Sequence, residues 1–242
     1  MGTARRNVCL RDRNVCTGDA VGEHAVNGAC VVLNGVTFGY GPNRPVLRSL
    51  DLTLRAGERV GLIGANGSGK TTLLHLLVGL RKPSAGRITC FGTPRTTESD
   101  FRDLRKRAGL LFQDSDDQLF CPTVGEDVMF GPLNLGKTHA EARAIASETL
   151  HRIGLANYES RVTYRLSGGE KRLVALATVL AMQPDVLLLD EPLTGLDEEH
   201  ETRITEILLN LPQAMLIVSH NREFLARVAQ RTYVLRNGSL EE

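Results

Sequence analysis

Apolar runs of four or five residues, separated by turn residues, recur along the chain and predict strands. The runs at 186–189 and 214–218 are apolar at every position, as is common in central strands of a parallel sheet that is covered on both faces. Apolar runs that include a polar residue or a glycine predict three further strands, at 59–63, 108–112 and 232–235. The second half of the chain is therefore expected to supply most of a buried parallel sheet.

The segment before residue 59 has a different pattern. Leu50, Leu52 and Leu54 alternate with polar residues, so this strand is expected to bury one face and expose the other. The strand-like segments 30–40 and 87–91 predict partners for it. Together these segments indicate a small antiparallel sheet.

Helix signals gather in the middle of the chain. A Ser or Thr followed three residues later by Glu is a capping box, in which two side chains satisfy free N–H groups at a helix start. Such pairs occur at Thr123–Glu126, Thr138–Glu141 and Ser167–Glu170. The segment at about 114–182 is therefore expected to be helical and to interrupt the sheet as an inserted subdomain.

Composition places the chain among soluble globular proteins. It has 242 residues, of which 42% are hydrophobic and 24% charged, and its net charge of +1 gives no reason to expect a nucleic-acid-binding surface. Five scattered cysteines without an export signal favour a reduced, cytoplasmic protein. No apolar run approaches the ~20 residues of a membrane-spanning helix, so work at a membrane requires a partner. Residues 1–29, with Cys9 and Cys16, show no periodicity and are expected to form a poorly ordered extension, whereas 30–242 are expected to form one domain.

The stretch GANGSGKTT at 64–72 matches G-x-x-x-x-G-K-[ST] and lies between a predicted strand and the apolar, helix-like run 73–80. Glycines let the backbone wrap a phosphate chain, and a helix N-terminus adds free N–H donors. Lys70 supplies a charge for the β- and γ-phosphates, and the Thr71 hydroxyl is expected to ligate Mg²⁺. The expected nucleotide-binding residues of this loop are Gly64, Asn66, Gly67, Ser68, Gly69, Lys70, Thr71 and Thr72.

Polar side chains also follow the predicted core strands. Asp190 is expected to hold Mg²⁺, directly or through a water molecule. Glu191 comes next; on a continuing strand its side chain points to the other side, where it can orient or deprotonate the attacking water. His220 is expected to hydrogen-bond a γ-phosphate or to orient Glu191. Gln113 is expected to reach the metal or the water.

A second anion site is predicted at a helix N-terminus about a hundred residues after the phosphate-binding loop in the sequence. Ser167, Gly168 and Gly169, followed by Glu170, expose backbone donors there. One nucleotide triphosphate can then be enclosed by the phosphate loop of one copy and this second site of another, which implies a homodimer with two shared nucleotides. Tyr40 either stacks on an adenine ring or is a structural aromatic residue.

As an ordered set, these motifs resemble the ATP-binding subunit of an ABC transporter, over about residue 30 to the C-terminus. The matching motifs are Walker A at 64–71, Gln113 as the Q-loop, LSGGE at 166–170 as the signature, VLLLDE at 186–191 as Walker B, TGLD at 194–197 as the D-loop, and His220 as the switch histidine. The resemblance implies the following fold class: α/β, a P-loop NTPase (RecA-like) core with an antiparallel β subdomain and an inserted α-helical subdomain. It also implies hydrolysis of ATP with Mg²⁺ and favours the adenine-stacking role for Tyr40.

A finer resemblance lies in the segments 114–136 and 177–192, which are similar to ATPases of energy-coupling factor importers, above all the cobalt and nickel branch. It implies a peripheral protein on the cytoplasmic face of the cell membrane, with a transmembrane coupling subunit and a substrate-binding membrane subunit as partners. It places Gln118, Leu119 and Phe120 near the groove that receives the coupling subunit. The alternative is a soluble ATPase of the same type that acts in cofactor or iron–sulfur cluster assembly.

Overall fold

The computed structural model describes residues 28–41 and 45–242. The predicted N-terminal extension, with Cys9 and Cys16, lies outside the described residues up to position 27. The strands are β1 (Ala29–Gly39), β2 (Pro45–Arg55), β3 (Arg59–Gly64), β4 (Ala85–Cys90), β5 (Thr93–Pro94), β6 (Ala108–Leu111), β7 (Val186–Asp190), β8 (Ala214–Val218), β9 (Arg231–Arg236) and β10 (Ser239–Glu241). The α-helices are α1 (Lys70–Leu77), α2 (Glu98–Arg105), α3 (Val124–Asn134), α4 (His139–Arg152), α5 (Gly168–Ala181), α6 (Glu198–Leu209) and α7 (Arg222–Val228).

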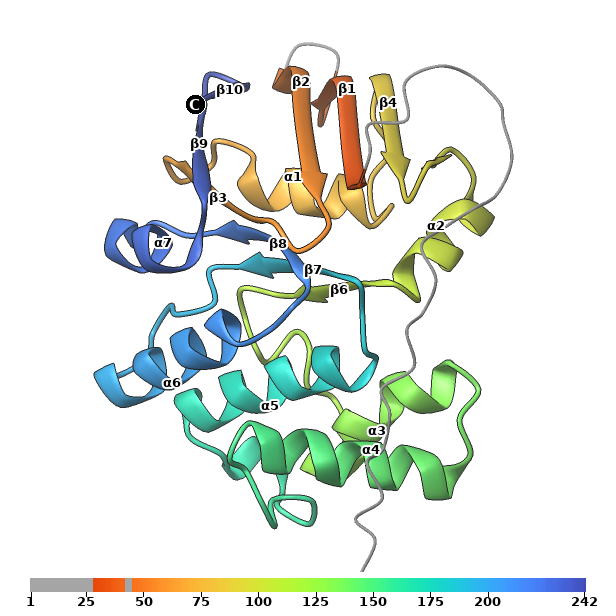
Figure 1. Ribbon diagram of the computed structural model, residues 1–242, viewed down its shortest axis with the longest axis vertical. Coiled ribbons are helices and arrows are strands. Elements are labelled where there is room, and N and C mark those ends of the chain that lie inside the picture. Colours follow the sequence, from red (N-terminus) through yellow and green to blue (C-terminus); the bar gives the residue numbers. More distant parts are fainter. Residues whose placement is uncertain (1–27, 42–44) are drawn as a thin grey trace, which may run out of the picture.

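These elements form two sheets with helices between and beside them. One sheet has the order β2-β1-β4-β5 and is antiparallel, and the other has the order β10-β9-β3-β8-β7-β6, in which only β10 runs antiparallel to its neighbour. In Figure 1 the antiparallel sheet stands at the top, α1 crosses below it, the second sheet fills the middle, and α3, α4 and α5 lie at the bottom. The predicted fold class is confirmed in this arrangement.

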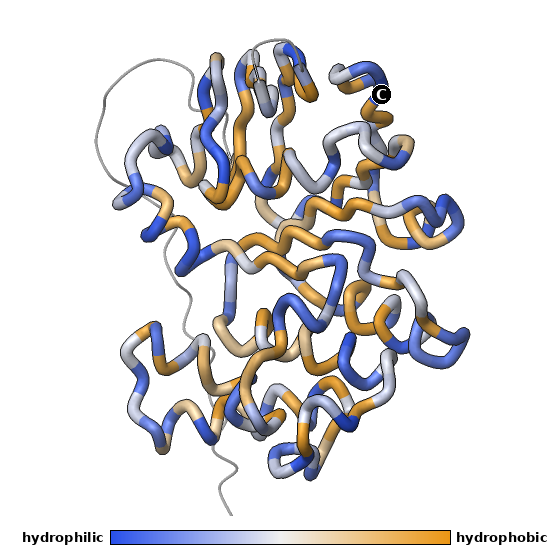
Figure 2. Tube along the Cα trace, turned by 180° about the vertical axis from the view of Figure 1, so that it is seen from behind, coloured by the Kyte–Doolittle hydropathy of each residue, from blue (hydrophilic) through white to orange (hydrophobic). Residues whose placement is uncertain are grey.

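The central strands are buried on both faces, which explains their uniform apolar sequence. On β7, Val186 and Leu188 join the core under the antiparallel sheet, whereas Leu187 and Leu189 join the core that faces the helices. Side chains alternate along a strand, so a strand covered on both sides must be apolar at every position. Figure 2 shows this as continuous hydrophobic stretches through the middle of the molecule.

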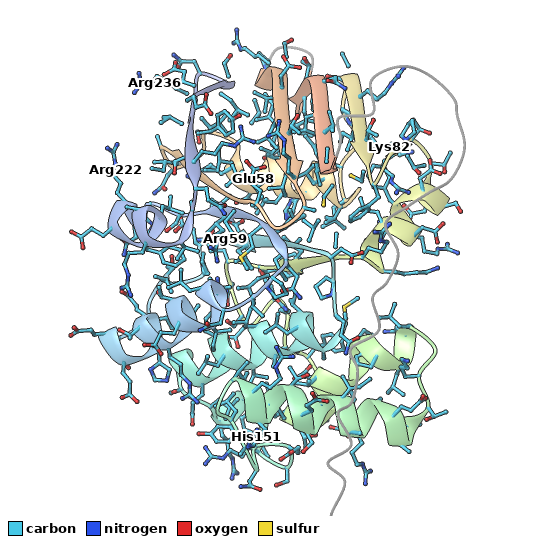
Figure 3. The ribbon with its side chains drawn as sticks, in the orientation of Figure 1. Glu58, Arg59, Lys82, His151, Arg222 and Arg236 are labelled. Atoms are coloured by element: carbon cyan, nitrogen blue, oxygen red, sulfur yellow. The ribbon has the colours of Figure 1, made fainter. Side chains whose placement is uncertain are left out.

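A half-buried ion pair joins the two sheets. Arg231 on β9 donates from Nε to Oε1 of Glu58 at 2.7 Å, and it also donates to the carbonyl of Thr53 on β2. Glu58 lies in the turn between β2 and β3, near the centre of Figure 3. The pair therefore fixes the antiparallel sheet against the strand that leads into the phosphate-binding loop.

The helical part of the chain begins where the capping boxes predict. Thr123, Thr138 and Ser167 each accept a bond from the N–H three residues on, and the Glu at that position bonds back. The helix predicted at 73–80 is shifted, because α1 begins at Lys70 and ends at Leu77. Within the described ranges, no helix combines the length and the apolar character needed to cross a bilayer.

Candidate active site

The phosphate-binding loop joins β3 to α1. Gly69 stands at the N-cap of α1 with φ 109°, a left-handed conformation that favours glycine, and a Cβ there would lie 2.7 Å from Cγ1 of Val46. No side chain caps α1, and its first turn holds no acidic residue. The N-terminal N–H groups of α1 thus stay available for an anion, and the helix dipole favours negative charge there.

Lys70 is held over this loop. Its side chain is almost fully buried, and its Nζ donates to the carbonyls of Gly64 at 2.8 Å and Ala65 at 3.1 Å. Asn66 and Gly67 form the exposed tip of the loop. Ser68 closes the turn through a bond from its N–H to the carbonyl of Ala65. The ammonium group therefore faces the concave side of the loop, where a phosphate chain is expected.

Tyr40 is held beside the same helix. Its hydroxyl lies 3.0 Å from Oγ1 of Thr72, and its ring packs edge-on against Phe38 at a centroid distance of 5.1 Å. The side chain remains 58% exposed, with the guanidinium of Arg81 near its ring. An aromatic face is thus open to a planar ligand next to the phosphate-binding loop.

Asp190 ends β7 in a buried position beside Thr71. Burial raises the pKa of its carboxyl, a hydrogen bond from the Thr71 side chain opposes that rise, and the charge of Glu191 adds to it. Within the described residues, Oδ1 of Asp190 is buried and has no hydrogen-bond partner. A buried carboxylate with a free oxygen beside a hydroxyl is a donor set that fits a hard divalent cation such as Mg²⁺.

Glu191 corrects one expectation. The strand does not continue through it: β7 ends at Asp190, and Glu191 has φ 46°. This left-handed backbone conformation costs a non-glycine residue about 1–3 kcal/mol and persists only where surrounding contacts hold it. The side chain is buried, and its Oε2 lies 2.8 Å from Nδ1 of His220 and accepts the backbone N–H of His220 at 3.2 Å. The side chains of Asp190 and Glu191 therefore diverge because the backbone turns at Glu191, and not because side chains alternate along a strand.

Two neighbouring cavities meet at these residues. One, of about 510 Å³, is lined by Tyr40, Lys70, Gln113, Asp190 and Glu191 together with the phosphate-binding loop. The other, of about 870 Å³, shares Thr71, Gln113 and Asp190 with it and extends to Gly168. The first cavity thus collects the predicted adenine, phosphate, metal and water contacts of one nucleotide site.

The predicted second anion site lies at the start of α5, apart from the first cavity. Ser167, Gly168, Gly169 and Glu170 do not line the cavity that holds Tyr40 and Lys70. The carboxylate of Glu170 accepts bonds from the N–H of Ser167, the hydroxyl of Tyr158 and a guanidinium N–H of Arg161. Glu170 thus stabilises the helix start, and its predicted contact with ATP stays a prediction.

Two residues at the site have roles that sequence reasoning missed. Arg172, on α5, is 2% exposed and donates to backbone carbonyls of Gln113 and of residues 190–192, where β7 ends. His200 bonds Asp197 through Nδ1 at 2.7 Å, and a Cβ at Gly169 would lie 2.5 Å from its ring. The ring of His200 thus leaves no room for a side chain at Gly169, the second glycine of the predicted anion site. No pattern in the sequence marked the burial of Arg172, because it directly follows the charged residues Glu170 and Lys171.

The comparisons with known proteins agree with this geometry. The family model described as ABC transporter matches residues 47–194, which include the phosphate-binding loop, Gln113, the start of α5 and both carboxylates. The chain belongs to the ABC transporter family. It is an ABC ATPase that binds and hydrolyses ATP, and the resemblance in its motifs is confirmed.

Sequence relatives include three ATP-binding proteins. An ABC transporter ATP-binding protein of Brucella suis is 57% identical over 81% of this chain and 82% of its own length. The nickel import ATP-binding protein NikO of Rhodobacter capsulatus is 44% identical over 86% of each chain. The energy-coupling factor transporter ATP-binding protein EcfA of Methanothermobacter thermautotrophicus is 42% identical over 87% of this chain and 69% of its own.

Solved structures of two proteins show the same fold. CbiO1 of Clostridium perfringens, described as part of the CbiONQ transporter complex, has a TM-score of 0.81 and 31% identity over 89% of this chain and 88% of its own. The cassette MJ0796, solved as a dimer and in a post-hydrolysis state with ADP and phosphate, has a TM-score of 0.79 and 27% identity over 88% of this chain and 97% of its own.

Proposed function

We propose that this ABC ATPase powers an energy-coupling factor importer as a homodimer on the cytoplasmic face of the cell membrane. The observation that carries the proposal is an exposed aromatic groove next to the segment that bears Gln113. Phe120 and Phe130 are 65% and 45% exposed and meet edge to face at 4.8 Å. Large exposed apolar groups of this kind mark a partner-binding surface.

The groove has room for the side chains of a partner helix. Its volume is about 330 Å³, and it is lined mainly by apolar side chains from the end of α1, β6, α3 and α5, among them Leu80, Leu110, Phe120, Phe130 and Met182. Gln118 fixes its floor, because its amide bonds the N–H of Phe112 and the carbonyl of Ala175. Leu119 is buried in the core. A helix of a transmembrane coupling subunit is the proposed occupant.

Glu191 is the proposed catalytic base. It takes a proton from the attacking water, whose oxygen bonds to the γ-phosphorus, while the bond from that phosphorus to the β–γ bridging oxygen breaks and ADP leaves with the electron pair. His220 holds the Glu191 carboxylate through Nδ1, which leaves Nε2 free to face the γ-phosphate. Lys70 and the N–H groups of α1 stabilise the phosphate charge.

Mg²⁺ is the proposed cofactor. Thr71, Gln113 and Asp190 would hold it, since they share both cavities and Asp190 carries the unpartnered oxygen. When bound, the ion neutralises charge on the β- and γ-phosphates. The chain's own residues position the ion and orient the water.

Two features support a head-to-tail dimer. The cavity that holds Tyr40 and Lys70 lacks the start of α5, and the proposed dimer supplies that donor set from a second copy. Charge is also distributed unevenly: Arg48, Arg222 and Arg236 line a groove beside the phosphate-binding loop, whereas the first turn of α6 carries three glutamates. Arg222 and Arg236 project outward on one side of the molecule in Figure 3. In the proposed dimer the arginines of one copy would face the glutamates of the other, and the relative MJ0796 was solved as a dimer.

Cobalt or nickel ions are the proposed cargo, on the strength of similarity to NikO and CbiO1. The test is reconstitution of the chain in liposomes with the membrane coupling and substrate-binding subunits of its own host. The proposal expects uptake of Co²⁺ or Ni²⁺ that depends on ATP and on Glu191. Uptake of a vitamin instead would contradict the proposed metal-ion cargo. Failure to assemble with any membrane subunit would favour the alternative, a soluble ATPase that acts in cofactor or iron–sulfur cluster assembly.

A further inference from the structure

Arg172 is one of the most deeply buried charged residues in the described part of the chain, at 2% exposure, and it lies on the first turns of α5. A guanidinium has five N–H donors in a rigid planar fork. The structure gives these donors five carbonyl acceptors. They are the backbone oxygens of Phe112, Gln113, Asp190, Glu191 and Pro192.

No carboxylate lies within ion-pair distance of Arg172 among the described residues. Its charge is balanced by backbone dipoles and by more distant acidic groups, and burial lowers its pKa to about 10. A buried cation of this kind is expensive to keep. The positions of its five carbonyl partners indicate which segments it holds in place.

The fork holds the backbone on both sides of Glu191. Nη2 donates to the carbonyl of Asp190 at 2.8 Å and to that of Glu191 at 2.7 Å. These two carbonyls belong to the two peptide groups that flank the Cα of Glu191, and the relative orientation of those groups is what φ and ψ describe. One guanidinium nitrogen therefore fixes the left-handed conformation, φ 46°, that directs the Glu191 side chain to His220.

The same side chain reaches the Gln113 segment. Nη1 donates to the carbonyls of Phe112 and of Gln113, the latter at 3.2 Å. Arg172 also lies on the helix whose start carries Ser167 and Gly168. A single side chain thus joins three segments that lie apart in the sequence and that meet at the nucleotide site.

We propose that Arg172 is a positioning residue for ATP hydrolysis: it sets the backbone of Glu191 and holds Gln113 in register with the start of α5. It lines the larger of the two cavities, but its five N–H donors are taken up by backbone carbonyls, so it acts through Glu191. The inference rests on the proposed role of Glu191 as the base.

The test is Arg172→Lys, which keeps the charge but replaces the planar fork with one ammonium group. We expect kcat to fall at least tenfold, while the KM for ATP changes less than threefold. The matched control is Arg95→Lys. Arg95 also donates to two carbonyls, those of Cys90 and Asp100, but does not line either cavity of the nucleotide site. Its variant should lose a similar amount of thermal stability and keep kcat within twofold.

A double-mutant cycle separates positioning from general support of the fold. If Arg172 acts through Glu191, Arg172→Lys should lower single-turnover phosphate release at least tenfold in the wild-type background and less than twofold in the Glu191→Gln background. An equal factor in both backgrounds, or a kcat within twofold of wild type, overturns the inference. If Glu191→Gln alone leaves hydrolysis unchanged, the proposed function itself is contradicted instead.

Discussion

Nδ1 of His220 lies 2.8 Å from Oε2 of Glu191, although 29 positions separate the two residues. The contact joins the ends of β7 and β8, which are adjacent parallel strands. Carboxyl ends of parallel strands meet at one edge of a sheet, where ligands of open α/β folds bind. The ABC ATPase thus assembles its proposed base and the histidine that orients it from two buried strands and one backbone turn.

Lys70→Ala should weaken ATP binding at least tenfold. The variant removes the ammonium charge that is held at the carbonyls of Gly64 and Ala65, and only the N–H groups of α1 remain to bind the phosphates. Isothermal titration calorimetry with ATP measures the change. Lys82→Ala, at an exposed lysine just beyond α1, is the control and should leave the affinity unaltered. Equal affinities for Lys70→Ala and wild type would remove the phosphate-binding assignment.

Phe120→Ala and Phe130→Ala should weaken binding to the membrane coupling subunit while the isolated chain keeps its ATPase activity. Each ring is an exposed apolar anchor, and losing such an anchor from an interface costs about 2 kcal/mol or more. Surface plasmon resonance with the detergent-solubilised coupling subunit gives the affinity. Leu209→Ala, another exposed apolar residue but on α6, should bind as wild type does. A loss shared by all three variants would argue against a groove-specific contact.

Gly79→Ala should destabilise the fold by about 1–3 kcal/mol, as overpacking of a core does. Gly79 has φ +75°, and a Cβ there would lie 2.2 Å from Cγ of Phe101, a buried residue of α2. Gly136→Ala is the matched control, because Gly136 has φ +85° and open space around a Cβ. The difference between the two urea-denaturation free energies isolates the packing effect. Equal values would mean that Phe101 moves aside freely.

Glu170→Gln should reveal a pH-dependent contribution to stability. The backbone N–H of Ser167, followed by the hydroxyl of Tyr158, holds the pKa of Glu170 below its ordinary value of 4.5. A lowered pKa in the folded state stabilises above the unfolded value and loses that effect as the pH falls through the folded one. The stability gap between wild type and variant should therefore be largest near pH ~7 and close as the pH falls below about 4. A gap that stays the same between pH ~7 and pH ~3 would contradict this prediction.

The sequence predicted well those features that depend on local pattern. The apolar runs 186–189 and 214–218 form β7 and β8, and all three predicted capping boxes are present. Both features depend on residues that are close together in the sequence, and this is why they could be predicted. The phosphate-binding loop likewise lies between β3 and α1, as its motif requires.

What the sequence did not reveal depends on backbone geometry and on long-range contacts. The strand ends before Glu191 because the backbone turns there, and no residue type near it in the sequence predicts a left-handed conformation. The acceptors of Arg172 are carbonyls, which every residue has, so no side-chain motif marks them. The carboxylate of Glu170 is bound by Tyr158 and Arg161, and no local motif joins these three residues.

The central claim is that two copies of this chain enclose ATP and that Glu191 then drives its hydrolysis. The most direct measurement is the mass of Glu191→Gln in solution, by light scattering coupled to gel filtration, with ATP and Mg²⁺. A particle of about twice 26.4 kDa that forms with ATP and is absent with ADP is the predicted result. A monomer under both conditions, from a variant that still binds ATP, would contradict the account.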